Sequence, residues 1–370
     1  MKKSQEHMLR RKIGDLNAHC GWKDYLLNDG PARGVRAFDL DNGRGAQLTV
    51  LADRGLDIAG LTFRGHQMAF LSKTGVKSPF LYAEDGARGF LRQFHAGLLT
   101  TCGLSYAGAA CEEDGQAYGL HGPFSNTPAG RVNAEMVYEG DDAVIQLSGE
   151  VRQSEVFGDN LVLKRVLRLQ TERDVIHIQD TVENQGFFKS PLMLVYHVNF
   201  GYPMLDEGSR VYTSAKTVTP RDETAKGGMD RWNVMDEPSA QRPEECFFHL
   251  GQPEDAFAML HNEKLGVAAI VRFDGEKLPL LCEWKCMREG DYALGLEPTT
   301  SGVLGRAAAR KDGSLTFLKP GESREFRLSI EFTGDSDVMK GYIKKSIKVH
   351  QSRFRGIQYK FTVYATAFAS

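Results

Sequence analysis

The stretch EFRLSIEF, at residues 325–332, has an apolar side chain at every second position and Glu, Arg or Ser between them. Successive side chains of a β-strand point to opposite faces of the sheet, so this period of two predicts a strand with one buried face and one polar face. The turn residues KPGE at 319–322 come just before it. The stretch AVIQLSGEV, at residues 143–151, alternates in the same way. Both are therefore predicted to be half-buried strands.

The same pattern recurs along the chain, whereas helical periodicity is rare. Residues 5–16 are expected to form one short helix, and the polar residues 214–243 a long loop over one face of the sheet. The 39 glycines suit a fold with many turns. Together these features predict an all-β sandwich with few short helices. Further strands are predicted at residues 35–40, 46–51, 161–170, 174–182, 192–198, 266–273, 279–285 and 291–296.

The composition is that of an ordinary folded protein, with 46 Lys and Arg against 48 Asp and Glu, and 41% hydrophobic residues. The formal net charge of -2 offers no general attraction to nucleic acid or to an anionic membrane. No apolar run is long enough to span a bilayer. The N-terminal segment has no apolar stretch after its basic residues, so no secretory signal is expected and the predicted location is the cytoplasm.

Residues 1–339 are predicted to form a single domain, with 1–34 as a lead-in, because large β-sandwiches often fold as one unit. Residues 340–370 contain seven Lys or Arg and no Asp or Glu. They are predicted to be a basic extension that either adds an edge strand, at residues 359–368, or forms a loosely held tail. The six cysteines lack the paired spacing of a zinc ribbon or a disulfide scaffold, so reduced, packed thiols are expected.

Three short stretches each carry one strong acid/base or hydrogen-bonding side chain. GLHGPFSNTP (119–128) contains His121, LVYHVNFGYP (194–203) contains His197, and LGLEP (294–298) contains Glu297. A histidine and a carboxylate on a rigid β scaffold suit one proton donor and one proton acceptor that act on a small substrate without a cofactor. No GxGxxG or P-loop motif follows a predicted strand, so dinucleotide and nucleoside triphosphate chemistry are not expected.

The second of these stretches carries a family resemblance. VENQG (182–186), then Pro191, then YHVNF (196–200) resemble the pattern V-x-N-x-G, Pro, H-x-x-F of the aldose 1-epimerases. With DRGLDI (53–58) and GLLTTCGL (97–104), the chain resembles a divergent, largely uncharacterised branch of the galactose mutarotase-like proteins over about residues 53–332. The resemblance implies a large antiparallel β-supersandwich with an open sugar-binding cleft, and interconversion of the α and β anomers of an aldose.

The resemblance also implies roles for individual residues. It makes His197 the proton donor and Glu297 the proton acceptor, and it assigns sugar hydroxyls to His121 and to an arginine ahead of it, for which Arg92 is the candidate. Where better-known mutarotases have His-Pro-Tyr-Phe, this chain has Asn199 in the third position. Asn199 is therefore placed in the substrate site, and galactose is not carried over as the substrate.

Arg54 is expected to be a structural ion-pair partner. Candidates for stacking on a sugar are Tyr106, Tyr118, Phe124, Tyr196 and Trp284.

The chemistry of ring opening suits a histidine and a glutamate. A base must take the proton of the anomeric hydroxyl while an acid protonates the ring oxygen, and reclosure on the other carbonyl face exchanges the anomers. No metal is required. The two groups are expected on opposite sides of the ring, with Glu297 ionised and His197 protonated near neutrality. A positively charged neighbour would favour the ionised form of Glu297. A carboxylate or carbonyl group near His197 would favour its protonated form.

Two alternatives from other classes stay open. The first is a metal-dependent sugar isomerase or lyase, in which His95, His121, His197 and Glu297 converge on one divalent ion. The second is a sugar-binding protein that has lost catalysis, although binding alone would not need a matched acid and base. In every case the expected partner is a small sugar or sugar derivative. Homodimer formation is left open.

Overall fold

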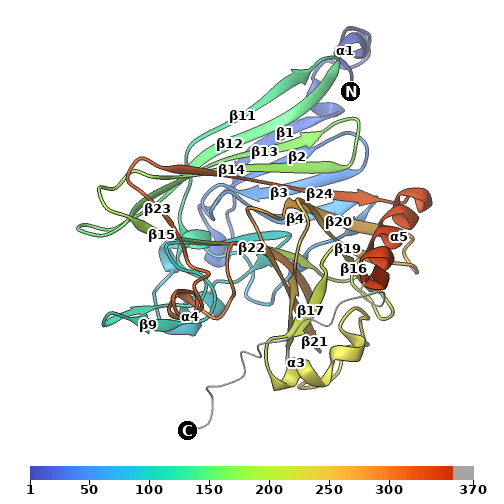
Figure 1. Cartoon of the computed structure of the whole chain (residues 1–370). Coiled ribbons are helices and arrows are strands. Elements are labelled where there is room, and N and C mark those ends of the chain that lie inside the picture. The colour runs from blue at the N-terminus through green and yellow to red at the C-terminus, as the bar shows by residue number, and fades with distance from the viewer. Residues whose placement is uncertain (353–370) are drawn as a thin grey trace.

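The computed structural model describes residues 1–352, and its largest element is an eight-stranded antiparallel sheet (Figure 1). The strand that contains residues 325–332, β24, pairs with both β14 and β20, so it lies inside this sheet. In spatial order the strands are β11 (Gly130–Glu139), β12 (Asp142–Ser154), β13 (Asn160–Gln170), β14 (Val175–Asn184), β24 (Ser323–Thr333), β20 (Val267–Asp274), β19 (Asp255–Asn262) and β16 (Arg210–Thr213).

A seven-stranded sheet and a five-stranded sheet complete the framework. The seven-stranded sheet contains β17 (Thr217–Pro220), β18 (Glu245–Leu250), β21 (Leu280–Arg288), β22 (Asp291–Thr299), β15 (Ser190–Phe200), β23 (Thr316–Leu318) and β8 (Leu99–Leu104), which pairs with β15. The five-stranded sheet contains β1 (Gly21–Leu26), β2 (Arg36–Asp41), β3 (Ala46–Leu51), β4 (Asp57–Phe63) and β5 (His66–Gln67). Two small pairs are β6 (Phe70–Leu71) with β7 (Ala96–Gly97), and β9 (Cys111–Glu113) with β10 (Gln116–Tyr118).

One apolar cluster joins the three sheets. It includes Phe38 from the five-stranded sheet, Leu163 and Phe326 from the eight-stranded sheet, and Leu294 from the seven-stranded sheet, and none of these is more than 2% exposed. The alternating apolar positions of the strands supply this core. The predicted fold, an all-β antiparallel supersandwich with few short helices, is therefore confirmed.

Five α-helices occur within residues 1–352: α1 (Lys3–Arg10), α2 (Gly86–Leu91), α3 (Glu223–Gly227), α4 (Arg306–Asp312) and α5 (Ser336–Ser352). The helix predicted at 5–16 is thus shorter and starts earlier. Residues 214–243 are not one long loop, because they contain β17, α3 and a 3₁₀ turn at Met229–Arg231. The lead-in of residues 1–34 contributes β1, which pairs with β2 in the five-stranded sheet. None of the helices within residues 1–352 is long and apolar enough to cross a membrane.

The prediction for the C-terminal segment was wrong up to residue 352. The proposed boundary between residues 339 and 340 falls inside α5, which lies against the β16–β19–β20 end of the eight-stranded sheet (Figure 1). Met339, Tyr342 and Ile343 pack there against Phe257 and Ile270. These three side chains are at positions i, i+3 and i+4, so they lie on one face of the helix. The prediction rested on the basic residues of the segment and did not use this apolar spacing. The strand predicted at 359–368 lies outside the described residues.

A fully buried arginine ties the sheets together below the site. Arg165 on β13 forms ion pairs of 2.6 Å with Asp57 on β4 and 2.6 Å with Asp180 on β14. It also donates to Thr101 on β8 at 2.8 Å, and Tyr196 on β15 donates to Asp180 at 2.8 Å. Five strands from all three sheets therefore share one polar network, and β15 is the strand that carries His197.

Within residues 1–352, Arg54 does not form the ion pair expected of it. Its buried guanidinium instead donates to the backbone carbonyls of Ser125, Lys77 and Gln93 at 2.7 to 2.9 Å. A guanidinium has five donors in a fixed fork, so it can hold several loops at once. Ser125 lies in the same loop as His121, and Gln93 follows Arg92 directly. Arg54 therefore holds the loops that contain two of the candidate site residues.

Candidate functional site

His197 and Glu297 meet in a cavity of about 290 Å³ on one face of the seven-stranded sheet. Strands β15, β22, β21 and β18 form its floor, with His197, Glu297, Cys282 and Cys246 on successive strands. The wall comes from α2 and from loops near residues 94, 109, 120 and 303. The lining residues are Phe90, Leu91, Phe94, Ala109, Leu120, His121, His197, Arg221, Glu244, Cys246, Cys282, Trp284, Glu297 and Val303.

The imidazole of His197 and the carboxylate of Glu297 are direct neighbours. Val198 pairs with Leu296 across the two strands, which puts His197 opposite Glu297 in the same register. Nε2 of the histidine lies 3.2 Å from Oε1 of the glutamate, and the residues are 5% and 2% exposed. The expectation of two groups on opposite sides of a sugar ring was therefore wrong. The ring oxygen and the anomeric hydroxyl are bonded to the same carbon, so an adjacent acid and base can serve both.

Burial decides where the proton of this acid/base pair resides. It lowers the pKa of His197 to about 3, with the imidazole of His121 acting in the same direction and Asn199 in the opposite one. Burial and the nearby Glu244 raise the pKa of Glu297 to about 8, against the opposing effects of Arg221 and Cys282. The free pair therefore holds one proton between about pH 3 and 8, and burial favours the glutamate as its position. Burial thus acts against the expected charges, because apolar surroundings favour two neutral groups over an ion pair.

Aromatic rings enclose the histidine. The ring centroids of Phe94 and Trp284 lie 5.3 and 5.5 Å from that of His197, and the centroid of His121 lies 5.7 Å away. Such contacts fix the orientation of the imidazole and exclude water from it. Of the aromatic residues suggested for stacking on a sugar, Trp284 lines the cavity. Tyr196 and Phe124 belong to the core.

His121 enters the cavity from a tightly folded loop. Its backbone has a φ of 61° and that of Gly122 a φ of 72°. A Cβ on Gly122 would lie 2.5 Å from the carbonyl oxygen of Gly103, so only glycine fits there. The ring packs on Phe90 with centroids 4.8 Å apart, and burial lowers the pKa of His121 to about 4. Its buried Nδ1 has no hydrogen-bond partner among the described residues, so a neutral imidazole faces the cavity with an unused polar atom.

Two residues predicted for the substrate site lie elsewhere. Arg92 follows α2 and points to solvent, where its side chain is 56% exposed and pairs with Asp85 at 2.9 Å. Phe90, Leu91 and Phe94 line the cavity from this part of the chain, whereas Arg92 does not. Asn199 is fully buried next to the cavity, and its Nδ2 donates to the backbone carbonyl of His197 at 2.9 Å. It contacts the histidine and is not part of the lining.

The arginine that does line the cavity is Arg221, which follows β17 and was not singled out from the sequence. Its guanidinium donates to Cys246 Sγ at 2.9 Å and forms ion pairs with Glu244 at 3.1 Å and Asp222 at 2.8 Å. Trp284 Nε1 also donates to Glu244, at 2.8 Å. The one sequence signal was the polar composition of residues 214–243, which indicated a functional loop without pointing to a residue.

Gly295 makes room for the acid/base pair. It precedes Glu297 by two positions on β22 and therefore shares its face. A Cβ on Gly295 would lie 2.6 Å from Glu297 Oε1, 3.1 Å from His197 Cε1 and 3.2 Å from Trp284 Cβ. Real Cβ atoms do not come within 3.0 Å of such neighbours, so the carboxylate would have to move.

Gly295→Ala is accordingly expected to lower any activity that uses the pair by roughly 10- to 100-fold, since a displacement near 1 Å can have that effect. The control is Gly60→Ala on β4, where the nearest atom to the added Cβ is Gln67 Nε2 at 3.6 Å. Activity should be compared with the melting temperature of both variants. Equal activities of the two variants would show that the space above Gly295 is not needed.

The metal-dependent alternative gains no support from the geometry. Within residues 1–352, no group of three or more His, Cys, Asp or Glu side chains is arranged to hold a metal ion. His95, one of the four proposed ligands, is 2% exposed and does not line the cavity.

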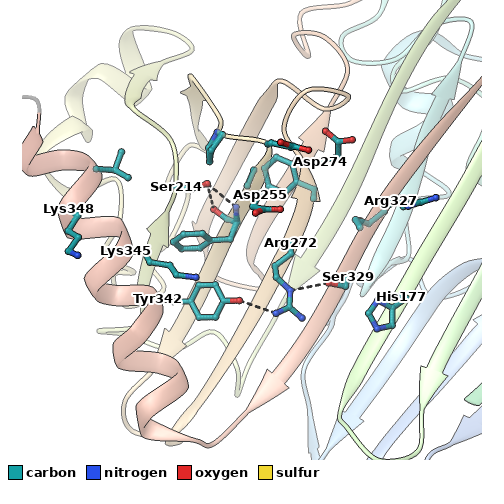
Figure 2. A pocket seen from close by; sticks show the side chains of 17 residues that line it. His177, Ser214, Asp255, Arg272, Asp274, Arg327, Ser329, Tyr342, Lys345 and Lys348 are labelled. Carbon is teal, nitrogen blue, oxygen red and sulfur yellow. Dashed lines mark hydrogen bonds between the residues drawn. The ribbon is translucent and has the colours of Figure 1, made fainter. Parts of the chain in front are cut away.

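A larger cavity, of about 770 Å³, lies between α5 and the outer face of β19, β20 and β24 (Figure 2). Arg272 spans it and donates to Ser329 Oγ at 3.2 Å and to Tyr342 Oη at 3.0 Å. Neither His197 nor Glu297 is in its lining. The acid/base chemistry therefore belongs to the smaller cavity.

Comparison with known proteins gives the family. A family model described as a domain of unknown function, DUF4432, matches residues 32–332. The chain belongs to the DUF4432 family. No curated protein matches this DUF4432 chain.

Solved structures relate the DUF4432 chain to mutarotase-like proteins. A "putative aldose 1-epimerase" from Klebsiella pneumoniae subsp. pneumoniae is 25% identical, with a TM-score of 0.84 over 94% of this chain and 91% of that one. A galactose mutarotase-like protein from Clostridium acetobutylicum is 14% identical (TM-score 0.59; 86% and 99% covered). A galactose 1-epimerase from Lactobacillus acidophilus is 13% identical (TM-score 0.55; 85% and 99% covered). These likenesses confirm the resemblance to the aldose 1-epimerase and galactose mutarotase-like proteins and its β-sandwich fold.

Proposed function

We propose that this DUF4432 protein is an aldose 1-epimerase that interconverts the α and β anomers of a small sugar. The observation that carries the proposal is the buried pair of His197 and Glu297, 3.2 Å apart in a cavity of about 290 Å³. Ligand pockets usually start at about 300 Å³, so this one suits a single monosaccharide. The names of the structural neighbours point to the same reaction.

The single proton held by the pair matches what ring opening and closure require. With the proton on His197, the carboxylate of Glu297 accepts the proton of the anomeric hydroxyl while the imidazolium protonates the ring oxygen, and the bond from the anomeric carbon to the ring oxygen breaks. The pair then has its proton on Glu297. After rotation of the aldehyde, Glu297 returns that proton to the carbonyl oxygen and His197 takes the one on the ring hydroxyl. The two arrangements of one proton are therefore the two working states.

The direct test follows the anomers of free sugars by polarimetry or by NMR exchange spectroscopy. The rate with purified protein should exceed that of spontaneous mutarotation for at least one neutral aldose. A sugar that binds without any acceleration would favour the non-catalytic alternative instead.

The pH dependence gives a second test. Because the pKa of Glu297 in the free protein is raised to about 8, the one-proton state is present below this pH and is lost above it. Once Glu297 has lost its proton next to a neutral His197, no acid remains for the ring oxygen. We expect kcat/KM for anomer exchange to fall about tenfold for each pH unit above about 8. A value of kcat/KM that stays constant or rises through this range, after subtraction of the spontaneous rate, would contradict the one-proton mechanism.

A further inference from the structure

The two ends of the cavity floor differ. Four successive strands of the floor carry, in order, His197, Glu297, Cys282 and Cys246. Arg221 lies beyond Cys246, to which it is hydrogen-bonded. If His197 acts on the ring oxygen and Glu297 on the anomeric hydroxyl, the orientation of a sugar follows. The carbon beyond the ring oxygen, C5, lies at the His197 end. The carbon beyond the anomeric centre, C2, lies toward the other end.

The end near His197 is apolar. Phe94 packs on both His197 and Phe90, with ring centroids 5.3 and 4.9 Å apart. Phe94, Leu120 and Val303 are partly buried side chains that pack on the apolar cluster around Phe90 and also line the cavity. A hydroxyl turned toward Phe94, Leu120 or Val303 would lose its water without gaining a hydrogen-bond partner from these three side chains, whereas a methyl group would gain apolar contact. His121 is the one polar side chain that the described lining residues offer there besides His197.

The opposite end is polar, but it does not favour an anion. Arg221 is the only Lys or Arg among the described residues that line the cavity, and the carboxylates of Glu244 and Asp222 already pair with it. A carboxylate or phosphate on the sugar would therefore meet no unpaired cation. Neutral hydroxyls can bind both the acceptor oxygens of Glu244 and the remaining donors of Arg221.

On this basis, and resting on the proposed mutarotase function, we propose that the substrate is a neutral 6-deoxyaldohexose. Its C5 methyl group contacts Phe94, Leu120 and Val303, and its 2- and 3-hydroxyls face Arg221 and Glu244. The expected ratio of kcat/KM between the 6-deoxy sugar and the corresponding hexose is modest. A pocket that merely lacks a partner for a hydroxyl discriminates by roughly 10- to 100-fold.

The test uses pairs of sugars that differ only at C6: 6-deoxy-D-galactose with D-galactose, and L-rhamnose with L-mannose, with D-galacturonic acid as the anionic probe. Anomer exchange is measured by NMR, and binding by saturation-transfer difference spectra on the same samples. In at least one pair, we expect kcat/KM for the 6-deoxy sugar to be at least about tenfold higher than for the corresponding hexose. The uronic acid should have the lowest kcat/KM of all the sugars. Equal or faster exchange with the hydroxymethyl or anionic sugars would overturn the proposal.

The two readouts separate this proposal from the mutarotase function. Preferential binding of a 6-deoxy sugar without accelerated exchange would support the substrate class and reject catalysis. Accelerated exchange without a 6-deoxy preference would support catalysis and reject the substrate class.

A variant tests the wall itself. Leu120→Gln keeps the approximate size of the side chain and adds an amide that can bind a 6-hydroxyl, so the ratio between 6-deoxy sugar and hexose should fall by about tenfold. Val303→Thr, a change of similar shape, should act in the same direction. The control is Leu304→Gln, at a side chain that is 50% exposed and does not line the cavity. An unchanged ratio in both wall variants, with melting temperatures equal to that of the control, would remove this wall from substrate selection.

Discussion

Glu297→Gln is expected to lower the rate of anomer exchange by about 10²- to 10⁴-fold, the usual contribution of a positioned acid or base. The amide keeps the size of the side chain and its place opposite His197, but it cannot accept the proton of the anomeric hydroxyl. Sugar binding should be largely retained, because His121, Arg221, Glu244 and Trp284 still line the cavity. Exchange NMR gives the rate, and saturation-transfer NMR gives the binding.

The fold provides a matched control for this variant. Glu283 on β21 is also fully buried, and its Oε2 lies 2.9 Å from Nε2 of His249, but neither residue lines the cavity. Glu283→Gln therefore perturbs a buried His–Glu pair in the same sheet without touching the proposed chemistry. Its melting temperature should fall while its exchange rate per folded molecule stays near that of the unmodified protein. If both glutamine variants lost activity in parallel with stability, Glu297 would be a structural residue.

The largest effect on stability is expected at Arg165. Arg165→Met removes the cation between Asp57 and Asp180, both of which are at most 1% exposed. Breaking a buried ion pair by removing one partner typically costs about 3–5 kcal/mol, because the remaining charge is buried without compensation. Here two carboxylates lose their partner, so the free energy of unfolding in urea should fall by at least that amount.

Arg131→Met is the control for the arginine variant. Arg131 pairs with Glu150 at 3.1 Å, but its side chain is 80% exposed. Exposed ion pairs contribute about 0–1 kcal/mol, so this variant should unfold near the midpoint of the unmodified protein. Similar midpoints for the two variants would mean that the buried network does not hold the sheets together. Tyr196 joins this network next to His197, so partial loss of the network should also reduce anomer exchange in the molecules that remain folded.

Local periodicity was enough to predict ten of the strands, but it missed others, among them β11 and β19. In residues 325–332 each apolar side chain is two positions from the next, and this spacing alone determines which face of β24 is buried. The same approach failed for α5, because the basic composition of residues 340–370 does not indicate a helix, and Met339, Tyr342 and Ile343 form a buried face only by packing on the outer face of β19 and β20. A helix that covers a sheet is stabilised by that sheet, and its own residues predict it less clearly.

The candidate site was likewise predicted in part from the sequence, while the rest of it depended on the tertiary structure. The sequence by itself determined that the chain forms an all-β sandwich and presents His121, His197 and Glu297 as its acid/base candidates, since motif spacing and alternation are local properties of the chain. Only the tertiary structure decided that the pair is in direct contact, that burial raises the pKa of Glu297, and that Arg221 lines the cavity while Arg92 points to solvent. These outcomes depend on which distant strands become neighbours and on how much water they exclude, and no single stretch of the sequence encodes either.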